Sequence, residues 1–224
     1  MGRPLRITYA GAHYHVTSRG SEQKDIFKSR RDREKFLSYL ESSVTRYGAA
    51  IHAYCLMTNH YHLLLETPVG NLPEIMRHIN GAYTNYYNTK RKRSGHLFQG
   101  RYKAILIEAD EYLMELSRYI HLNPVRCGIV EKPEAHPWSS YNDYIGARPA
   151  PGWLRMDMLS AHFGDCKKHR QFVEFRILPV VAFFRAHGML IVVQIICVFP
   201  VSTCSLRAQA VRIHRRVHRP RMNV

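Results

Sequence analysis

Two apolar runs, AIHAYCLMTN and HYHLLLETP, adjoin at Thr58-Asn59, and this arrangement limits the possible folds more than any other feature of the sequence. So short a connection favours an antiparallel β-hairpin. The residues on either side of the hairpin then indicate which larger sheet it joins.

Residues before the hairpin predict one strand and one helix. His13–Arg19 alternate and contain β-forming residues, which favours a strand. Ser29, with Asp32 three residues later, precedes apolar residues at helical spacing, and this is the pattern of a capped helix. Gly48 is expected to end that helix.

Residues after the hairpin predict a helix, a strand and a second helix. Asn71 is typical of an N-cap, and that helix ends in the polar run 90–95. The strand YKAILIEA follows, and Asp110 begins a helix that Pro124 is expected to end, because the residue before proline avoids the α region. The order β-α-β-β-α-β-α predicts an α+β fold, a ferredoxin-like or RRM-like antiparallel sheet with helices on one face and the other free for ligands.

Charge and cysteine content restrict the class of function. The chain has 33 Lys and Arg against 17 Asp and Glu, a net charge of +16, which favours a polyanionic partner such as nucleic acid. Its 5 cysteines are scattered, which argues against a disulfide framework and against a cysteine-built zinc site. With no apolar run of a signal peptide at the N-terminus, we expect a cytoplasmic protein.

The C-terminal part differs in composition from the rest. Its uncharged stretch 187–206 is nearly long enough to cross a bilayer, but Gln194 and Pro200 interrupt it, so we expect no membrane partner. The chain is accordingly divided into a domain at 1–146, a linker at 147–165 and an atypical basic and hydrophobic tail at 166–224. We expect truncation after Gly164 to leave an active domain.

His60 and His62 are the first candidates for chemistry. Side chains alternate along a strand, so both imidazoles project from one face, about 7 Å apart, while Tyr61 points to the other. Two such imidazoles can share a metal ion, although surface or hydrogen-bonded histidines would give the same pattern. His13 and His15 offer an identical pair, and spacing alone does not select between the two.

Tyr119 and Asn123 stand four residues apart on the last predicted helix, hence on one face at the edge of its apolar stripe. Both could be packing or capping residues. In the functional interpretation Tyr119 is a nucleophile and Asn123 adds an oxygen ligand to a histidine pair. Trp138, Tyr141 and Tyr144 are interpreted as packing residues and not as base-stacking residues.

Basic residues interleave with aromatic ones near the fourth strand. Phe98 and Tyr102 are flanked by the basic run 90–93 and by Arg101 and Lys103, a pattern suited to phosphate contact and base stacking. A solvated helix end would explain the run 90–93 equally well. The candidate DNA-binding residues are Lys90, Arg91, Lys92, Arg93, Arg101 and Lys103.

Several motifs in order carry a resemblance to a known family. YHVTSRG, MTNHYHLLLETP, SGHLFQGRYKAILIEADEYLMELSRYIHLNPVRCGIV and PWSSY together resemble the REP-associated tyrosine transposases, of the insertion-sequence-200-like, single-tyrosine HUH superfamily, over about residues 3–146. The resemblance implies a bacterial, nucleoid-associated enzyme that cuts single-stranded or hairpin DNA through a tyrosine joined to the 5′-phosphate.

The same resemblance assigns roles to particular residues. It implies that Tyr119 is the nucleophile, that His60 and His62 hold the metal with Asn123 as third ligand, and that the metal is Mg²⁺ or Mn²⁺. It treats His13 as incidental. It implies no small-molecule substrate and leaves open whether the chain acts as a monomer or a homodimer.

Two other classes of function compete with this interpretation. A nucleic-acid-binding module without chemistry could use an RRM-like sheet, although no RNP-like aromatic pattern is present. A zinc hydrolase would need a further ligand beside the histidines, for which Glu66 is the available acid.

Overall fold

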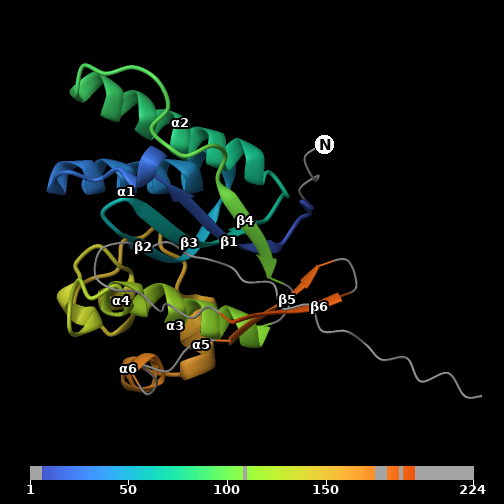
Figure 1. The fold of residues 1–224 in the computed structure, drawn as a ribbon. Coiled ribbons are helices and arrows are strands. Elements are labelled where there is room, and N and C mark those ends of the chain that lie inside the picture. Colours follow the sequence, from blue (N-terminus) through green and yellow to red (C-terminus); the bar gives the residue numbers. More distant parts are fainter. Residues whose placement is uncertain (1–6, 108–109, 175–180, 187–188, 195–224) are drawn as a thin grey trace, which may run out of the picture. The chain divides into compact units, whose positions relative to one another are not determined.

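The computed structural model describes residues 7–107, 110–174, 181–186 and 189–194. The chain forms two compact units, Met1–Leu178 and Pro179–Val224, which are described separately. The first contains the predicted sheet and its helices (Figure 1).

A four-stranded sheet is the centre of the first unit. Its strand order is β2 (Ala50–Leu56), β3 (His60–Thr67), β1 (Ala12–Arg19) and β4 (Lys103–Ile107), with every neighbouring pair antiparallel. The expected hairpin is therefore β2–β3, and β1 lies between the hairpin and β4. The predicted ferredoxin-like α+β fold is confirmed.

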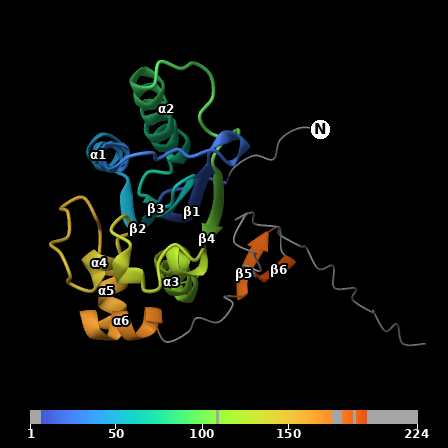
Figure 2. The same cartoon turned by 60° about the vertical axis from the view of Figure 1, so that its left-hand side comes forward.

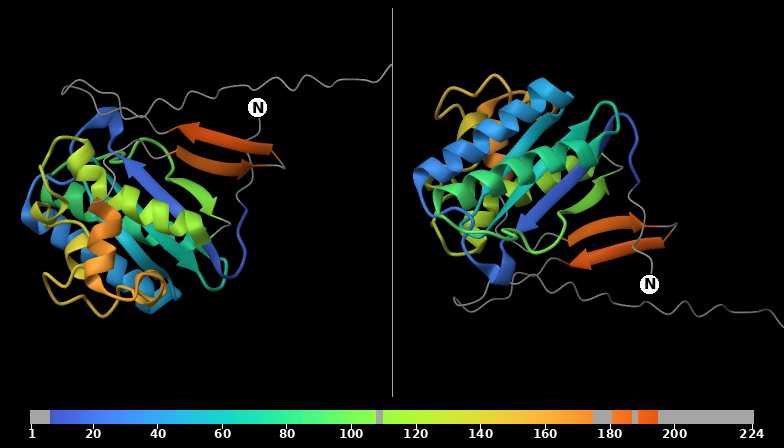
Figure 3. Two further views of the ribbon diagram at one scale, coloured as in Figure 1. Left: turned by 90° about the horizontal axis from the view of Figure 1, so that it is seen from below. Right: turned by 90° about the horizontal axis from the view of Figure 1, so that it is seen from above.

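Two long helices cover one face of the sheet. α1 (Arg30–Tyr47) and α2 (Leu72–Lys90) lie side by side across it (Figure 3, right). Phe36 of α1 contacts Tyr61 of β3 and Tyr83 of α2, with ring centroids 4.8 and 5.1 Å away, and all three rings are fully buried. These aromatic contacts hold the two helices to the sheet.

The predicted caps of these helices are partly confirmed. The Ser29 hydroxyl accepts the Asp32 amide at 3.3 Å, and Gly48 adopts the left-handed conformation, with φ 66°, that ends α1. Asn71 occupies the N-cap of α2 but forms no side-chain cap. Its amide nitrogen instead donates to the Tyr47 carbonyl at 2.9 Å and so joins the two helices.

α3 (Asp110–Arg126) packs on the opposite face of the sheet, against β2 and β3 (Figure 2). α3 therefore covers the β2 and β3 part of the face that was expected to be free for ligands. The expectation that Pro124 ends the helix is wrong, because α3 continues to Arg126. Proline lacks only its own amide, and the Cys127 amide still donates to Asn123 at 3.0 Å.

Short helices follow α3 and complete the first unit. They are η2 (Pro133–Ala135), α4 (Tyr141–Tyr144), α5 (Asp157–Phe163) and α6 (Cys166–Glu174), while η1 (Ser21–Gln23) follows β1. Tyr141 and Tyr144 are buried, and the Tyr144 hydroxyl donates to the His52 carbonyl at 2.6 Å, which confirms their packing role.

The compact unit extends beyond the boundary expected from composition. Leu154 forms a bridge with Ile51 of β2, so the expected linker at 147–165 is attached to the sheet. Val173 of α6 is fully buried against Leu122 and Tyr141. The boundary between the units accordingly lies after Leu178, and α6 belongs to the first unit.

The second unit contains one described hairpin, β5 (Val181–Ala186) paired with β6 (Met189–Gln194). The described residues of the apolar stretch 187–206 are thus part of a strand, and its remainder lies outside the described residues. Among the described residues, no helix is long and apolar enough to cross a membrane.

Truncation should distinguish the two boundaries. We expect a chain ending at Leu178 to keep the thermal stability of the first unit, whereas one ending at Gly164 should unfold more easily. The shorter chain loses α6, and burial of Val173 alone contributes about 1.5–3 kcal/mol. Circular dichroism during heating measures the difference, and equal melting temperatures would show that α6 adds nothing to the fold.

Candidate active site

The alternation of β3 places His60 and His62 on the face that carries α3. Their ring centroids are 5.1 Å apart, and Tyr61 between them is buried among the aromatic rings of the other face. His60 is 5% exposed and His62 1%. The pattern of side chains predicted for this strand is therefore present.

Tyr119 of α3 packs edge-on against two histidines. Its ring centroid lies 5.5 Å from that of His62 and 5.9 Å from that of His15, at interplanar angles of 85° and 79°. The residue is 3% exposed. The structure thus brings together Tyr119 and His62, which are far apart in the sequence.

His15 is a member of this cluster that sequence reasoning did not select. Its Nε2 and the Nδ1 of His62 share a hydrogen bond of 2.9 Å, and the two rings are stacked. The identical His-x-His pair in the first strand was the available signal, but only the pairing of β1 with β3 shows that the two pairs meet.

One ring nitrogen of each histidine in the pair is hydrogen-bonded. The Nδ1 of His60 donates to the Asn59 side-chain oxygen at 2.6 Å. The Nε2 of His62 is buried and has no hydrogen-bond partner among the described residues. Metal-binding histidines commonly use one ring nitrogen for the ion while the other is hydrogen-bonded, so both residues fit a metal.

Burial keeps these imidazoles neutral. It lowers the pKa of His15 to about 4, and burial with the nearby Arg19 charge lowers the pKa of His60 to about 4. Burial, followed by the neighbouring His60 and His15, holds the pKa of His62 well below its ordinary value. Neutral imidazole is the form that binds metal, so these rings are suited to coordination at neutral pH.

Asn123 lies one turn after Tyr119 on α3 and is 3% exposed. Its side-chain oxygen accepts the Cys127 thiol at 3.6 Å. Its role as a metal ligand stays a prediction. Glu66, the acid considered for a zinc site beside His60 and His62, lies at the far end of β3 and contacts His52 instead.

The basic run after α2 lies away from the histidines. Lys90 and Arg91 bind the buried Asp32 carboxylate at 2.8 and 2.5 Å, on the helical face opposite the histidine pair. Burial would raise the pKa of Asp32, but these two cations hold it well below its ordinary range. Both residues therefore stabilise the α1–α2 layer through Asp32. Their assignment to a DNA site stays a prediction.

The other two residues of the run are also separated from the site. Arg93 lies over the Tyr87 ring at 5.6 Å and donates to the His96 carbonyl at 3.3 Å. Lys92 is in the turn that follows α2.

Arg101 and Lys103 lie closer to the histidine pair. Arg101 lines an open groove of about 900 Å³ formed by segments 21–22 and 96–102. The groove adjoins the end of β1, where the Gln99 amide donates to the Arg19 carbonyl and Arg19 pairs with His60. Lys103 is exposed and pairs with Thr17, which pairs with His62, so its side chain shares the histidines' face.

The site combines a ferredoxin-like sheet, a pair of buried imidazoles and a tyrosine of α3. Residues 8–123 match the family model described as "Transposase IS200 like", more than half of the chain, and the protein therefore belongs to the IS200-like transposase family. This confirms the resemblance noted in the sequence and identifies the chain as an enzyme of the transposase class.

Two relatives agree with this assignment. A REP-associated tyrosine transposase named in Haemophilus influenzae is 26% identical over 134 residues, which cover 52% of this chain and 73% of the relative. A solved REP-associated tyrosine transposase bound to a REP hairpin has the same fold, with a TM-score of 0.56 and 16% identity over 70% of this chain and 93% of that one.

Proposed function

We propose that this transposase cuts and rejoins DNA strands through a covalent 5′-phosphotyrosine at Tyr119, with a divalent metal at His60 and His62. One observation carries the proposal. The buried Nε2 of His62 has no hydrogen-bond partner among the described residues, and the ring of the same histidine contacts Tyr119. The histidine with the available nitrogen and the proposed nucleophile are therefore in ring contact.

The proposed step exchanges one phosphate ester for another. The Tyr119 oxygen loses its proton to solvent and forms a bond to phosphorus, while the bond from phosphorus to the 3′ oxygen breaks and that oxygen takes up a proton. The ester energy is conserved for rejoining, so no energy-rich co-substrate is needed. The metal, when bound, stabilises charge on the phosphate oxygens.

The residues of the chain have separate roles in this step. His60 and His62 hold the metal, Asn123 is the proposed third ligand, and His15 orients His62 through the shared hydrogen bond. Tyr119 is 3% exposed, so a phosphate can reach its hydroxyl only after the surrounding packing shifts. Mg²⁺ or Mn²⁺ is the proposed metal.

The proposed substrate is single-stranded or hairpin DNA. The solved neighbour is bound to a REP hairpin, and the groove beside Arg101 with the exposed Lys103 offers cations next to the metal pair. The rival interpretation, an RRM-like module without chemistry, is disfavoured because α3 occupies the β2–β3 part of the face on which such modules stack bases.

Replacing Tyr119 with Phe should abolish the covalent adduct with labelled single-stranded DNA in Mn²⁺, while DNA affinity stays within about twofold because no positive charge is lost. Denaturing gel electrophoresis detects the adduct. The matched control is Tyr87→Phe, whose hydroxyl donates to the Asp25 carbonyl on the opposite face. An adduct that persists in Tyr119→Phe would assign the nucleophile to another tyrosine.

Replacing His62 with Ala should eliminate cleavage. It should also weaken Mn²⁺ binding more than His15→Ala does, and the loss expected for His15→Ala is about 10- to 100-fold. Calorimetric titration measures Mn²⁺ binding by both variants, with His78→Ala on α2 as control.

In the unaltered chain the affinity for Mn²⁺ should stay nearly constant from pH 8 to about 5, because protons compete for His60 only near its pKa of about 4. A steep loss starting near pH 6.5 would contradict the buried, neutral pair.

Two pairs of charge removals test the DNA path. The double substitution Arg101→Ala with Lys103→Ala should weaken single-strand binding and reduce the slope of log affinity against log salt by about 0.7 per lost contact. Lys92→Ala with Arg93→Ala removes the same charge and should change the slope less. A larger change in the salt slope for Lys92→Ala with Arg93→Ala would show that the basic run, and not Arg101 with Lys103, contacts DNA.

A further inference from the structure

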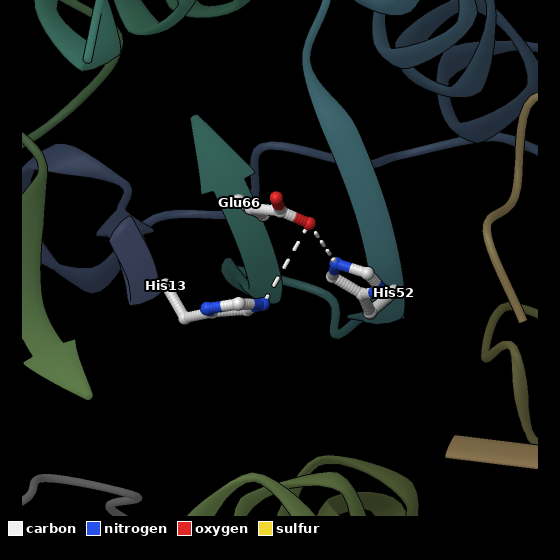
Figure 4. Close-up of side chains that lie close together, drawn as sticks. All are labelled: His13, His52 and Glu66. Atoms are coloured by element: carbon white, nitrogen blue, oxygen red, sulfur yellow. Dashed lines mark hydrogen bonds and ion pairs between the residues drawn. The ribbon is translucent and has the colours of Figure 1, made fainter. Parts of the chain in front are cut away.

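A second group of potential metal ligands lies on the same face of the sheet as the histidine pair. His13 of β1, His52 of β2 and Glu66 of β3 point toward one another (Figure 4), and their ligand atoms all lie within 4.8 Å of each other. The Glu66 Oε2 is 3.0 Å from the His52 Nε2 and 3.6 Å from the His13 Nε2.

The pairing of three strands brings these residues together. His13 and Glu66 are direct cross-strand partners, so their side chains share a face. The register of β2 against β3 shifts between Ile51 and Ala53, and His52 is the extra residue. His52 lies in this bulge, and its Nε2 is 3.0 Å from the Glu66 carboxylate.

The spacing suits a small tetrahedral ion. Nitrogen and oxygen ligands about 2.0–2.2 Å from zinc are about 3.3 Å from one another at tetrahedral angles. The distances from the Glu66 oxygen to the two histidine nitrogens, 3.0 and 3.6 Å, lie on either side of that value, and all three ligand atoms lie within 4.8 Å of one another. Two histidines and one glutamate are also a ligand set that zinc uses in proteins, with a fourth position for water.

The hydrogen bonds of His52 indicate that a cation binds at its Nε2. Its Nδ1 lies 3.2 Å from the Arg155 carbonyl, which can only accept, so Nδ1 carries a proton. In a neutral ring the Nε2 then has a lone pair directed at a Glu66 oxygen 3.0 Å away. Two acceptors at this distance repel unless a proton or a metal ion lies between them.

A metal ion satisfies these groups better than a proton does. His52 is 1% exposed, and burial disfavours a doubly protonated imidazole. The Nε2 of His13 is also buried and without a hydrogen-bond partner among the described residues. A proton between His52 and Glu66 would leave this third atom unsatisfied, whereas an ion can bind all three.

We propose that His13, His52 and Glu66 form a second metal site, for Zn²⁺ or a similar late divalent ion, that joins β1, β2 and β3. The site is separate from the proposed catalytic pair, because Glu66 stands four residues after His62 on β3, about 13 Å along the strand. The side chains of His13 and Glu66 are 22% and 19% exposed, so the cluster lies near the surface of the protein. The ligands come from three strands, so the ion binds the folded chain and stabilises it.

The test uses the full chain with His60→Ala and His62→Ala as background, so that the catalytic pair cannot contribute. After removal of metal with a chelator and dialysis against Zn²⁺, this background should bind one zinc per chain more than the same protein with His13→Ala added. Zinc should raise the melting temperature of the background by several degrees and that of the His13→Ala protein much less. Bound Co²⁺ should show the visible absorption of a four-coordinate site only in the background.

Two further variants make the result specific. Glu66→Gln preserves side-chain volume and should weaken zinc binding at least tenfold, whereas His78→Ala, a histidine paired with Ser42 on the other face, should have no effect. Circular dichroism verifies that each variant folds. The proposal would be overturned by equal zinc content with and without His13, or by a background protein whose melting temperature zinc does not change. Neither result depends on DNA cleavage.

Discussion

The packing of Tyr119 against His62 and His15 is the contact on which the proposed chemistry depends. It requires α3 to lie across β2 and β3, and it requires both histidines to face that helix. Because the three side chains come from α3, β3 and β1, the cluster exists only in the folded chain. Burial of the same rings lowers the pKa values of the histidines and keeps them neutral, so one packing event provides both position and protonation state.

Two copies of the tripeptide His-Tyr-His organise the sheet. They lie in β1 and β3, and alternation sends Tyr14 and Tyr61 into the core below α1 and α2 while the histidines face the other way. The antiparallel register then offsets the two copies. His15 meets His62 at one place and His13 meets Glu66 at another, so a repeated motif contributes to two distinct clusters and not to one.

The basic residues divide according to the face on which they lie. Lys90 and Arg91 neutralise Asp32, whose carboxylate is fully buried where α1 begins and α2 ends. These two partly exposed cations therefore balance a buried charge of the protein itself. Lys103 and Arg101 are exposed beside the histidine pair, on the part of the sheet that α3 leaves open, and are free to approach a phosphate backbone. Net charge alone does not show which cations are exposed, and only the folded structure separates these two groups.

Local patterns in the sequence determined the elements and their order. The short hairpin connection, the Ser29 cap and Gly48 each act within a few residues, and for that reason the α+β fold and the shared face of His60 and His62 could be predicted. Contacts between distant segments were decided only by tertiary structure. The pairing of β1 with β3 placed His15 beside His62, the pairing of β2 with β3 brought His52 to Glu66, and burial of Val173 made α6 part of the first unit. Strand register and helix packing depend on the whole core, and no single segment contains that information.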